Sequence, residues 1–283
     1  MIQDILPHKF SVEFSKKEIQ SNDVVLLFQD NKILCKFVED RLVFPTLMDI
    51  QKLVSEGEQP YEYYFLFHID QVYFYTIKDS DIIESSEWTY VTVRQLRYAL
   101  PIWNAFAAAT GLQLYRWLSN NKFCGRCGSP MEPHKTERAL CCPNCKKTVY
   151  PLIMPSVIIA VTNGDSLLLT KYNQKHSPYP NYALVAGYTE IGETLEDTVR
   201  REVKEEVNLD VKNIKYYKSQ PWALTDTLLV GFFCELDGNP DISLDEDELS
   251  EGKWFHRNEI PPTTSTVSLT GEMIEYFRSG KTL

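Results

Sequence analysis

Residues 187–209, GYTEIGETLEDTVRREVKEEVNL, carry seven carboxylates in twenty-three positions. Their spacing distinguishes a solvated acidic helix from a site that binds divalent cations. Glu202, Glu205 and Glu206 are spaced i, i+3 and i+4, so on a helix they share an arc of about 100°. Like charges on one arc repel one another by roughly a few tenths of a kcal/mol per pair. A solvated helix gains nothing from that repulsion, whereas Mg²⁺ or Mn²⁺ binds such hard oxygen ligands.

The helix that positions this arc is indicated by apolar residues at every fourth position, which are Leu195, Val199, Val203 and Val207. This repeat predicts an amphipathic helix from Thr194 to about Val207. The carboxylate arc lies next to the apolar stripe, and therefore at the edge of the face that the helix buries. An edge position suits the floor of a cleft better than open solvent.

A second set of metal-ligating residues lies in CGRCGSPMEPHKTERALCCPNC, residues 124–145. Two C-x2-C pairs, separated by fourteen residues, are formed by Cys124, Cys127, Cys142 and Cys145. Each pair fits a tight turn that directs two thiolates at one ion, and four sulfurs complete a closed tetrahedral shell. We therefore expect one structural Zn²⁺ per chain, with no open position for chemistry.

The other cysteines give no second metal site. Cys141 is expected to be a spectator, although it could replace Cys142 in a looser register. His134 is expected to be an ordinary loop residue, because four sulfurs already fill the shell. The odd total of seven cysteines argues against a disulfide framework.

Composition limits the class of protein. The chain has 283 residues, of which 43% are hydrophobic, and a formal net charge of −10. This length predicts about two domains. The acidic charge argues against a general nucleic-acid binder, so no DNA partner is expected. The amino terminus does not resemble a signal peptide, and apolar runs such as VIIAV at 157–161 are too short to span a bilayer. We expect a cytoplasmic protein without membrane contact.

The amino-terminal third has a mixed α and β pattern. Residues 24–37 and 63–77 are rich in β-branched and aromatic side chains, and each is predicted to form a β-hairpin. From Thr92 to Asn120 the pattern becomes helical, with a break at Pro101, where one helix ends and the next begins. No catalytic group of residues is evident here.

After the cysteines the pattern changes to strands. Residues 156–172 are predicted to form two strands around an Asn-Gly-Asp turn. Residues 181–188 predict a further short strand that ends at Gly187, directly before the acidic helix. These strands are therefore the elements that place the helix.

The acidic stretch resembles the Nudix box, G-x5-E-x7-R-E-U-x-E-E-x-G-U, where U is a bulky aliphatic residue. The matching positions are Gly187, Glu193, Arg201, Glu202, Val203, Glu205, Glu206 and Leu209. Asn208 stands where the pattern has glycine. Asparagine is the next-best residue for a left-handed helix C-cap, so we expect the turn to be preserved.

A four-cysteine ribbon directly before a Nudix box resembles the NADH pyrophosphatase (NAD-diphosphatase, NudC-like) family of Nudix hydrolases. That family carries S-Q-P-W-P-F-P-x-S, and residues 219–227 are SQPWALTDT, with Ala-Leu-Thr in place of P-F-P. The resemblance covers roughly residues 90–283. It implies an α+β chain: a mixed α/β domain at 1–119, a zinc ribbon at 120–151 and a Nudix α/β/α sandwich at 152–283.

The resemblance also implies roles for residues near the box. It assigns the catalytic Mg²⁺ or Mn²⁺ to the side chains of Glu202, Glu206 and Glu248 and the backbone carbonyl of Ala186. Glu205 becomes a further ligand or the base that orients water. Glu193 and Arg201 are expected to form a structural ion pair that shapes the loop after Gly187.

The substrate contacts that the resemblance implies are Arg94, Glu137, Tyr150, Tyr188, Gln220, Pro221, Trp222, Ala223, Leu224, Thr225, Asp226, Thr227 and Ser268. Tyr188 matches an aromatic residue that stacks on nicotinamide. Arg94 matches a basic residue that reaches the substrate across a homodimer interface, and Ser268 matches a backbone contact. For Tyr150, packing in a core is an equally open alternative.

The implied reaction is hydrolysis of the diphosphate of NAD(H) to nicotinamide mononucleotide and AMP, with removal of NAD caps from RNA 5′ ends as a second activity. Two alternatives remain open. A different nucleotide substrate, such as ADP-ribose or a nucleoside triphosphate, is compatible with the altered P-F-P segment. A non-catalytic zinc-ribbon nucleotide sensor is the other, although the intact carboxylates and the net charge argue against it.

Overall fold

The computed structural model describes residues 1–53, 61–77, 85–173, 175, 181–261 and 267–281. Its internal contacts divide the chain into two compact units. The N-terminal unit contains residues 2–152 and 223–226, and the C-terminal unit contains Met1 and residues 153–222 and 227–283. No helix among the described residues is long and apolar enough to cross a membrane.

Among the described residues, the part of the N-terminal unit before the four-cysteine segment contains two small β-sheets. The first has the order β1-β6-β7-β2, formed by β1 (Phe10–Ser11), β6 (Tyr63–Ile69), β7 (Val72–Ile77) and β2 (Val24–Val25). The second is formed by β3 (Phe28–Gln29), β4 (Lys32–Val38), β5 (Arg41–Val43) and β8 (Thr89–Thr92). The hairpin predicted at residues 63–77 is confirmed, because β6 and β7 pair antiparallel.

The hairpin predicted at residues 24–37 is only partly correct. β3 and β4 form its antiparallel turn, but β2 leaves it and pairs parallel with β7 in the other sheet. The reason is visible in the burial of residues 25–28, four consecutive apolar side chains that are all buried. A run without exposed alternate positions does not fit a two-stranded hairpin with one solvated face.

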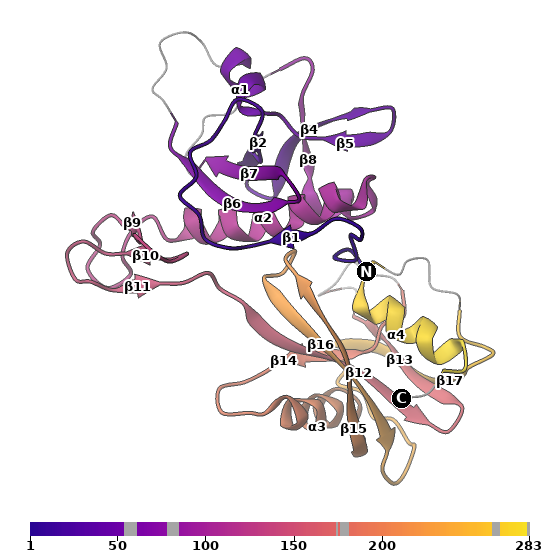
Figure 1. Cartoon of the computed structure of the whole chain (residues 1–283). Coiled ribbons are helices and arrows are strands. Elements are labelled where there is room, and N and C mark those ends of the chain that lie inside the picture. Colours follow the sequence, from indigo (N-terminus) through magenta and orange to yellow (C-terminus); the bar gives the residue numbers. More distant parts are fainter. Residues whose placement is uncertain (54–60, 78–84, 174, 176–180, 262–266, 282–283) are drawn as a thin grey trace. The chain divides into compact units, whose positions relative to one another are not determined.

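Three helical segments complete the first part of this unit, which are α1 (Leu47–Leu53), η1 (Val93–Tyr98) and α2 (Ile102–Asn120). The predicted break at Pro101 is confirmed, and the segment before it is a 3-10 helix. In Figure 1, α2 runs along the strands of the same unit. Their packing is close at Gly111, where an added Cβ would lie 2.5 Å from Leu26 Cδ1.

The four-cysteine segment forms a small three-stranded sheet of β9 (Glu132–Pro133), β10 (Leu140–Cys141) and β11 (Thr148–Val149), with β10 in the centre. This segment has no large core of its own. It shares one with the end of α2, where Trp117 and Leu118 pack against Met131 and Leu140.

The C-terminal unit is built on a six-stranded mixed sheet in the order β15-β16-β12-β13-β17, with β14 paired to β12. Its elements are β12 (Met154–Asn163), β13 (Ser166–Tyr172), β14 (Val185–Tyr188), α3 (Leu195–Val207), β15 (Val211–Trp222), β16 (Thr227–Leu236), β17 (Leu249–His256) and α4 (Leu269–Arg278). The predicted strands at 156–172 are confirmed as β12 and β13. β14 continues one residue past the predicted end.

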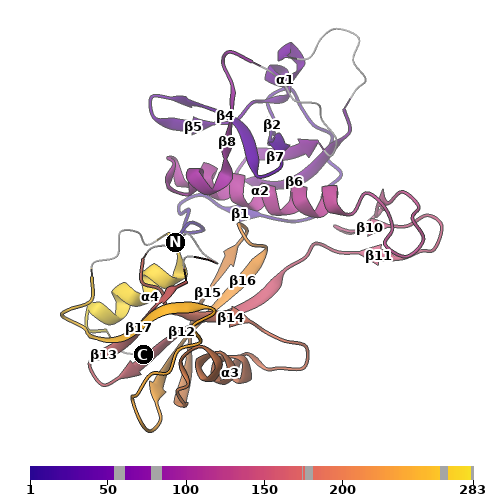
Figure 2. The same cartoon turned by 180° about the vertical axis from the view of Figure 1, so that it is seen from behind.

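Alternation along β12 explains the layers of this unit. Val157, Ile159 and Val161 pack in the core that α3 covers, whereas Ile158 and Ala160 pack in the core that α4 covers. Successive side chains of a strand point to opposite faces, so one buried strand can serve two layers. Figure 2 shows α3 and α4 on opposite sides of the sheet. The expected α/β/α sandwich is therefore confirmed.

Candidate active site and metal centres

The helix α3 begins and ends at capping residues that its sequence supplies. The Thr194 hydroxyl accepts a hydrogen bond from the Asp197 backbone N–H at 3.2 Å, which satisfies one of the free donors of the first turn. At the other end Asn208 adopts the left-handed conformation, with φ 55° and ψ 34°. The expectation that asparagine preserves the C-cap turn is confirmed.

The carboxylate arc of α3 lies at the edge of the buried face, as its spacing predicts. Glu202 and Glu206 are buried, with 9% and 3% of their surface exposed, while Glu205 is exposed. The backbone N–H of Ala186 in β14 hydrogen-bonds Glu206. The Oε2 atom of Glu206 has no hydrogen-bond partner in the part of the chain that the structure describes.

The electrostatics of this cluster favour the binding of a cation. Burial raises the pKa of Glu206 to about 8, and repulsion from Glu202 and Glu248 acts in the same direction. Burial also raises the pKa of Glu202, against the opposing effect of Arg201. Buried carboxylates are expensive unless they are paired or coordinate a metal. An orphaned oxygen among converging carboxylates therefore fits a hard divalent cation.

Glu248 reaches this cluster from a distant part of the sequence. It follows Asp245, whose backbone N–H donates to the Glu206 carbonyl at 3.0 Å and so ties the segment before β17 to α3. The Glu248 charge raises the pKa of both buried glutamates of the helix. The acidic run around residue 248, which alone resembles a surface loop, is thus placed beside the carboxylate arc.

Gly187 allows the strand β14 to approach the helix. A Cβ added there would lie 1.9 Å from Glu202 Cδ, a distance that no real pair of atoms tolerates. The Gly187 carbonyl accepts a hydrogen bond from the Ser156 hydroxyl at 2.8 Å, which fixes this part of β14 against β12. The glycine at the start of the box therefore makes room for a carboxylate.

Arg201 joins the loop to the helix. The expected ion pair with Glu193 is present, at 2.6 Å from Nε to Oε1, and it lowers the pKa of Glu193 to about 2. The same guanidinium donates to the Tyr188 carbonyl at 2.9 Å. It also contacts Glu202 at 2.8 Å and Glu205 at 2.9 Å, two links that the sequence pattern did not indicate. Arg201 therefore orients two members of the carboxylate arc.

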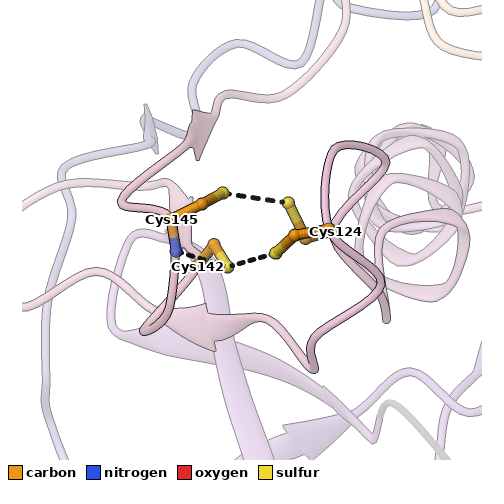
Figure 3. A group of neighbouring side chains, drawn as sticks. Cys124, Cys142 and Cys145 are labelled. Atoms are coloured by element: carbon orange, nitrogen blue, oxygen red, sulfur yellow. Dashed lines mark hydrogen bonds between the residues drawn. The ribbon is translucent and has the colours of Figure 1, made fainter.

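The four cysteines form the second candidate centre. Their ligand atoms all lie within 4.8 Å of one another. The sulfurs of Cys124 and Cys145 are 3.5 Å apart, and so are those of Cys127 and Cys142. A tetrahedral zinc with bonds of about 2.3 Å requires sulfurs about 3.8 Å apart. Figure 3 shows the thiols of Cys124, Cys142 and Cys145 directed toward a common centre.

Local hydrogen bonds lower the pKa of two of these thiols, Cys127 and Cys124. The Lys147 backbone N–H acts in the same direction on Cys145, but burial and hydrogen bonds with the other three cysteines outweigh it and raise the pKa of Cys145 to about 11. The pKa of Cys127 falls to about 6, first through hydrogen bonds from Ser129 and then through Cys142. The backbone N–H of Arg126 lowers the pKa of Cys124. Thiolates are the form that binds metal. Cys141 and His134 are not members of the cluster, in agreement with the prediction.

Two of the expected substrate residues contact each other. The Tyr150 hydroxyl donates to Glu137 Oε2 at 2.5 Å, and Tyr150 is 57% exposed. Packing in a core therefore does not account for Tyr150. Tyr188 is also exposed, at 49%, one residue after Gly187. Arg94 is exposed on η1 of the N-terminal unit.

The residues at 219–222 and 268 have structural contacts. Gln220 is fully buried; its amide donates to the Val267 carbonyl at 2.9 Å and accepts from the Leu269 N–H at 2.7 Å. Ser268 caps α4 by accepting from the Gly271 N–H. Pro221 and Trp222 end β15, and Trp222 pairs with Thr227 at the start of β16. Gln220 and Ser268 are therefore brought together where α4 begins.

The loop of residues 223–226 has a partner that the sequence did not predict. Arg116 of α2 lies 3.1 Å from the Asp226 carboxylate and donates to the Ala223 carbonyl at 3.1 Å and the Leu224 carbonyl at 3.4 Å. These contacts place the loop in the N-terminal unit. A single arginine between Tyr115 and Trp117 on a largely apolar helix gave no signal of this role.

The helix, the glycine that admits its carboxylate and the sheet between two helices define a Nudix-type domain. The profile of the NUDIX domain matches residues 152–277, and the profile of the NADH pyrophosphatase zinc ribbon domain matches residues 119–150. The chain belongs to the Nudix family, in the group that carries the NADH pyrophosphatase zinc ribbon.

Curated relatives agree with this assignment. The chain is 37% identical over 185 residues to an NAD-capped RNA hydrolase NudC of Haemophilus influenzae (strain PittEE), a match covering 64% of this chain and 69% of that one. It is 40% identical over 163 residues to the NudC of Salmonella paratyphi C, covering 57% of this chain and 62% of the relative. The matched part thus spans less than two thirds of the Salmonella protein.

Solved structures are more distant. A NUDIX hydrolase from Nitrosomonas europaea is 22% identical, with a TM-score of 0.45, and the match covers 56% of this chain and 91% of that one.

Proposed function

We propose that this protein is a metal-dependent hydrolase that cleaves the diphosphate of NAD(H) to nicotinamide mononucleotide and AMP, and that it also removes NAD caps from RNA 5′ ends. The observation that carries the proposal is the buried pair Glu202 and Glu206 beside Gly187, with Glu206 Oε2 unpartnered among the described residues. The substrate class is supported by the zinc ribbon and by the relatives, which are named as NAD-capped RNA hydrolases.

We propose that Mg²⁺ or Mn²⁺ is held by the carboxylates of Glu202, Glu206 and Glu248 with the Ala186 carbonyl. Such an ion neutralises a diphosphate and lowers the pKa of bound water. Glu205 is exposed at the edge of the arc, where Arg201 holds its carboxylate. In this proposal Glu205 either completes the ligand set or accepts the proton of the attacking water.

Positioning of the substrate is assigned in this proposal to Tyr188 and to further residues that the family resemblance indicates. Tyr188 offers an exposed ring directly after Gly187, suited to stacking on nicotinamide. Its backbone is held by Arg201, so the ring starts from a fixed point. The Glu137–Tyr150 pair and residues 220–227 are proposed as further contacts. Gln220 and Ser268 contribute through backbone they hold in place, because their own polar atoms are engaged.

The proposal includes one structural Zn²⁺ in the ribbon, a homodimer and a cytoplasmic location. Zinc is supported by four converging sulfurs with no fifth group for chemistry among the described residues. The dimer rests on the family resemblance of Arg94, which is exposed on η1. Light scattering of the purified protein tests it. A reducing compartment is supported by seven unpaired cysteines.

The test is a panel of NADH, NAD, ADP-ribose and diadenosine polyphosphates, together with a short NAD-capped RNA, scored by the identity of the products. The expected products of NADH are the reduced mononucleotide and AMP. Glu206→Gln is expected to lose at least about 100-fold in kcat, because a ligand charge is removed while the apolar stripe of α3 remains. Glu196→Gln on the same helix is the matched control, since Glu196 is exposed and outside the arc.

Three results would reject the proposal. Near-normal turnover by Glu206→Gln would remove the metal assignment. Binding of NADH without release of product would favour a nucleotide sensor. Preferred cleavage of ADP-ribose would favour the other substrate, which the Ala-Leu-Thr segment at 223–225 keeps under consideration.

A further inference from the structure

The N-terminal unit contains a cavity that the proposed reaction does not use. Its volume is about 580 Å³, within the range of small-molecule sites. It is formed by the segment before β2, by β6, by the end of α2 and by the ribbon around β9 and β10. Tyr63, Phe65 and Tyr75 contribute aromatic walls. All of these residues belong to one unit, and the carboxylate cluster belongs to the other.

Trp117 adds a further aromatic side chain to the wall of this cavity. Its side chain lines the cavity and is only 8% exposed. Together with the tyrosine and phenylalanine rings it gives the cavity flat apolar surfaces, which suit a planar ligand.

Arg138 brings a cation without a counter-charge. It lines the cavity from the ribbon and is half-buried. Its Nη2 donates to the Val12 carbonyl at 3.0 Å, and among the described residues no carboxylate forms an ion pair with it. Burial lowers the pKa of its guanidinium. Burying a guanidinium without an anion is unfavourable, which makes an anionic ligand a natural partner.

The charged side chains around the cavity also favour an anionic ligand. Lys16, Lys17 and Lys135 line it with Arg138, against the two carboxylates of Glu18 and Glu62. Lys17 is already engaged, with its ammonium 3.1 Å from the centre of the Tyr73 ring. The chain as a whole carries a net charge of −10. A local excess of cations in so acidic a chain is a feature of this cavity.

We propose that this cavity binds a nucleoside monophosphate unit, with the base against the aromatic walls and the phosphate against Arg138. Flat bases stack on aromatic side chains, and arginine binds phosphate through two parallel hydrogen bonds. The unit could be a free nucleotide or a nucleotide of a single-stranded RNA. Both present the same chemistry, so the experiment separates them.

The test uses the full-length Glu206→Gln protein with its zinc retained and without added divalent metal, so that the carboxylate site does not hold phosphate. Titration calorimetry measures binding of AMP and, separately, of a 5′-phosphorylated single-stranded triadenylate. Arg138→Gln is expected to weaken binding at least about tenfold, because the guanidinium is the buried anion partner.

Arg126→Gln is the matched control, because Arg126 is an exposed arginine of the same ribbon that does not line the cavity. Zinc content and circular dichroism establish that each variant is folded. If Arg138→Gln does not fold, Lys135→Gln replaces it, with an expected weakening of about two- to threefold.

Arg138-dependent binding of AMP alone assigns the site to a free nucleotide, and Arg138-dependent binding of the triadenylate alone assigns it to RNA. Either result supports the proposal. Absence of binding by both ligands, or equal affinity of the Arg138→Gln and Arg126→Gln proteins, overturns it. Because the Nudix site is disabled throughout, failure here leaves the proposed hydrolase activity untouched.

Discussion

At Glu206, burial and the charges of Glu202 and Glu248 act together, and all of them favour the protonated acid in the absence of metal. The ionised side chain in this position is unfavourable when no cation is bound. In the proposed metal site a bound cation would reverse this balance, because the same three carboxylates that repel one another would become its ligands.

This balance predicts a pH dependence of stability in protein that holds its zinc but no added divalent cation. The pKa of Glu206 is raised from 4.5 to about 8 in the folded protein, so the folded state binds this proton more tightly than the unfolded chain. The resulting stabilisation is complete below pH 4.5 and is lost as the pH rises to about 8. The free energy of unfolding in urea should therefore fall across this window in wild type relative to Glu206→Gln.

Millimolar Mg²⁺ should remove most of that difference, because a cation replaces the proton. Carboxylates with lowered pKa values, such as Glu193, are ionised in both states above pH 4.5 and do not contribute in this window. Parallel stability curves for wild type and Glu206→Gln would show that Glu206 is not held as a buried acid.

Gly187 gives a second test at the same scale. In Gly187→Ala the new methyl would lie 1.9 Å from Glu202 Cδ, so Glu202 must leave its position. We expect at least about a 100-fold loss of kcat for NADH, because a misplaced ligand disrupts a site that depends on geometry. Gly125→Ala is the control, since its added Cβ meets nothing closer than Lys147 Nζ at 3.9 Å. Full activity of Gly187→Ala would contradict the close approach.

The relative positions of several site residues could be predicted from the sequence, for a physical reason. The i, i+3, i+4 spacing of Glu202, Glu205 and Glu206 fixes their arc wherever the helix is placed. The need for glycine at position 187 could not be predicted, because it depends on the distance between β14 and α3. The links from Arg201 to Glu202 and Glu205 likewise depend on a rotamer that a pattern does not specify.

Among the elements, α3 was predictable because its signals are local. Thr194, the four-residue apolar repeat and Asn208 define the helix from within its own sequence. The pairing of the segment at 24–25 was not predictable, because its partner strand β7 is distant in the sequence. The order of the loop at 223–226 was predictable only in part. The absence of both prolines predicts a loop that its own sequence constrains weakly, but Arg116 constrains it from another element.

We therefore predict that Arg116→Gln raises the KM for NADH more than it lowers kcat. The variant frees the Ala223 and Leu224 carbonyls and the Asp226 carboxylate, so the loop must be ordered on binding, at about 1 kcal/mol per newly ordered residue. The variant should weaken binding of the substrate and of the transition state equally, since the loop is not expected at the scissile bond. Steady-state kinetics with NADH measure it.

The comparison variant rebuilds the family segment with Ala223→Pro, Leu224→Phe and Thr225→Pro. Alone it should tighten the KM for NADH, because two prolines fix backbone φ and the phenylalanine adds a flat apolar surface. Combined with Arg116→Gln it should reduce the loss, since both changes act on the order of one loop. Unchanged KM and unchanged selectivity in the triple variant would show that this segment does not set substrate choice.

At the scale of the whole molecule, the ribbon is part of the N-terminal unit through a shared core. Cys124 and Cys142 are buried together with Trp117 and Leu118 of α2. The cysteine spacing predicted one structural zinc site, and the spacing alone could not show that the end of α2 packs against it. The carboxylate cluster lies in the other unit, so the two metal centres should respond separately to substitution.

The last prediction tests that separation. Cys145→Ser should release about one zinc per chain and lower the unfolding temperature, because ligand binding free energy is part of the folding free energy of such a site. Loss of the metal should also reduce hydrogen-exchange protection around Trp117, whose core includes the ribbon.

Cys141→Ser is a close control, since Cys141 is half-buried in the same segment but outside the ligand set. Metal-activated turnover per folded molecule should persist, because the glutamates of α3 and the ribbon sulfurs belong to different compact units. Wild-type protein purified without zinc would refute the structural assignment, and an equal loss of metal in Cys141→Ser would transfer the ligand role to the looser register.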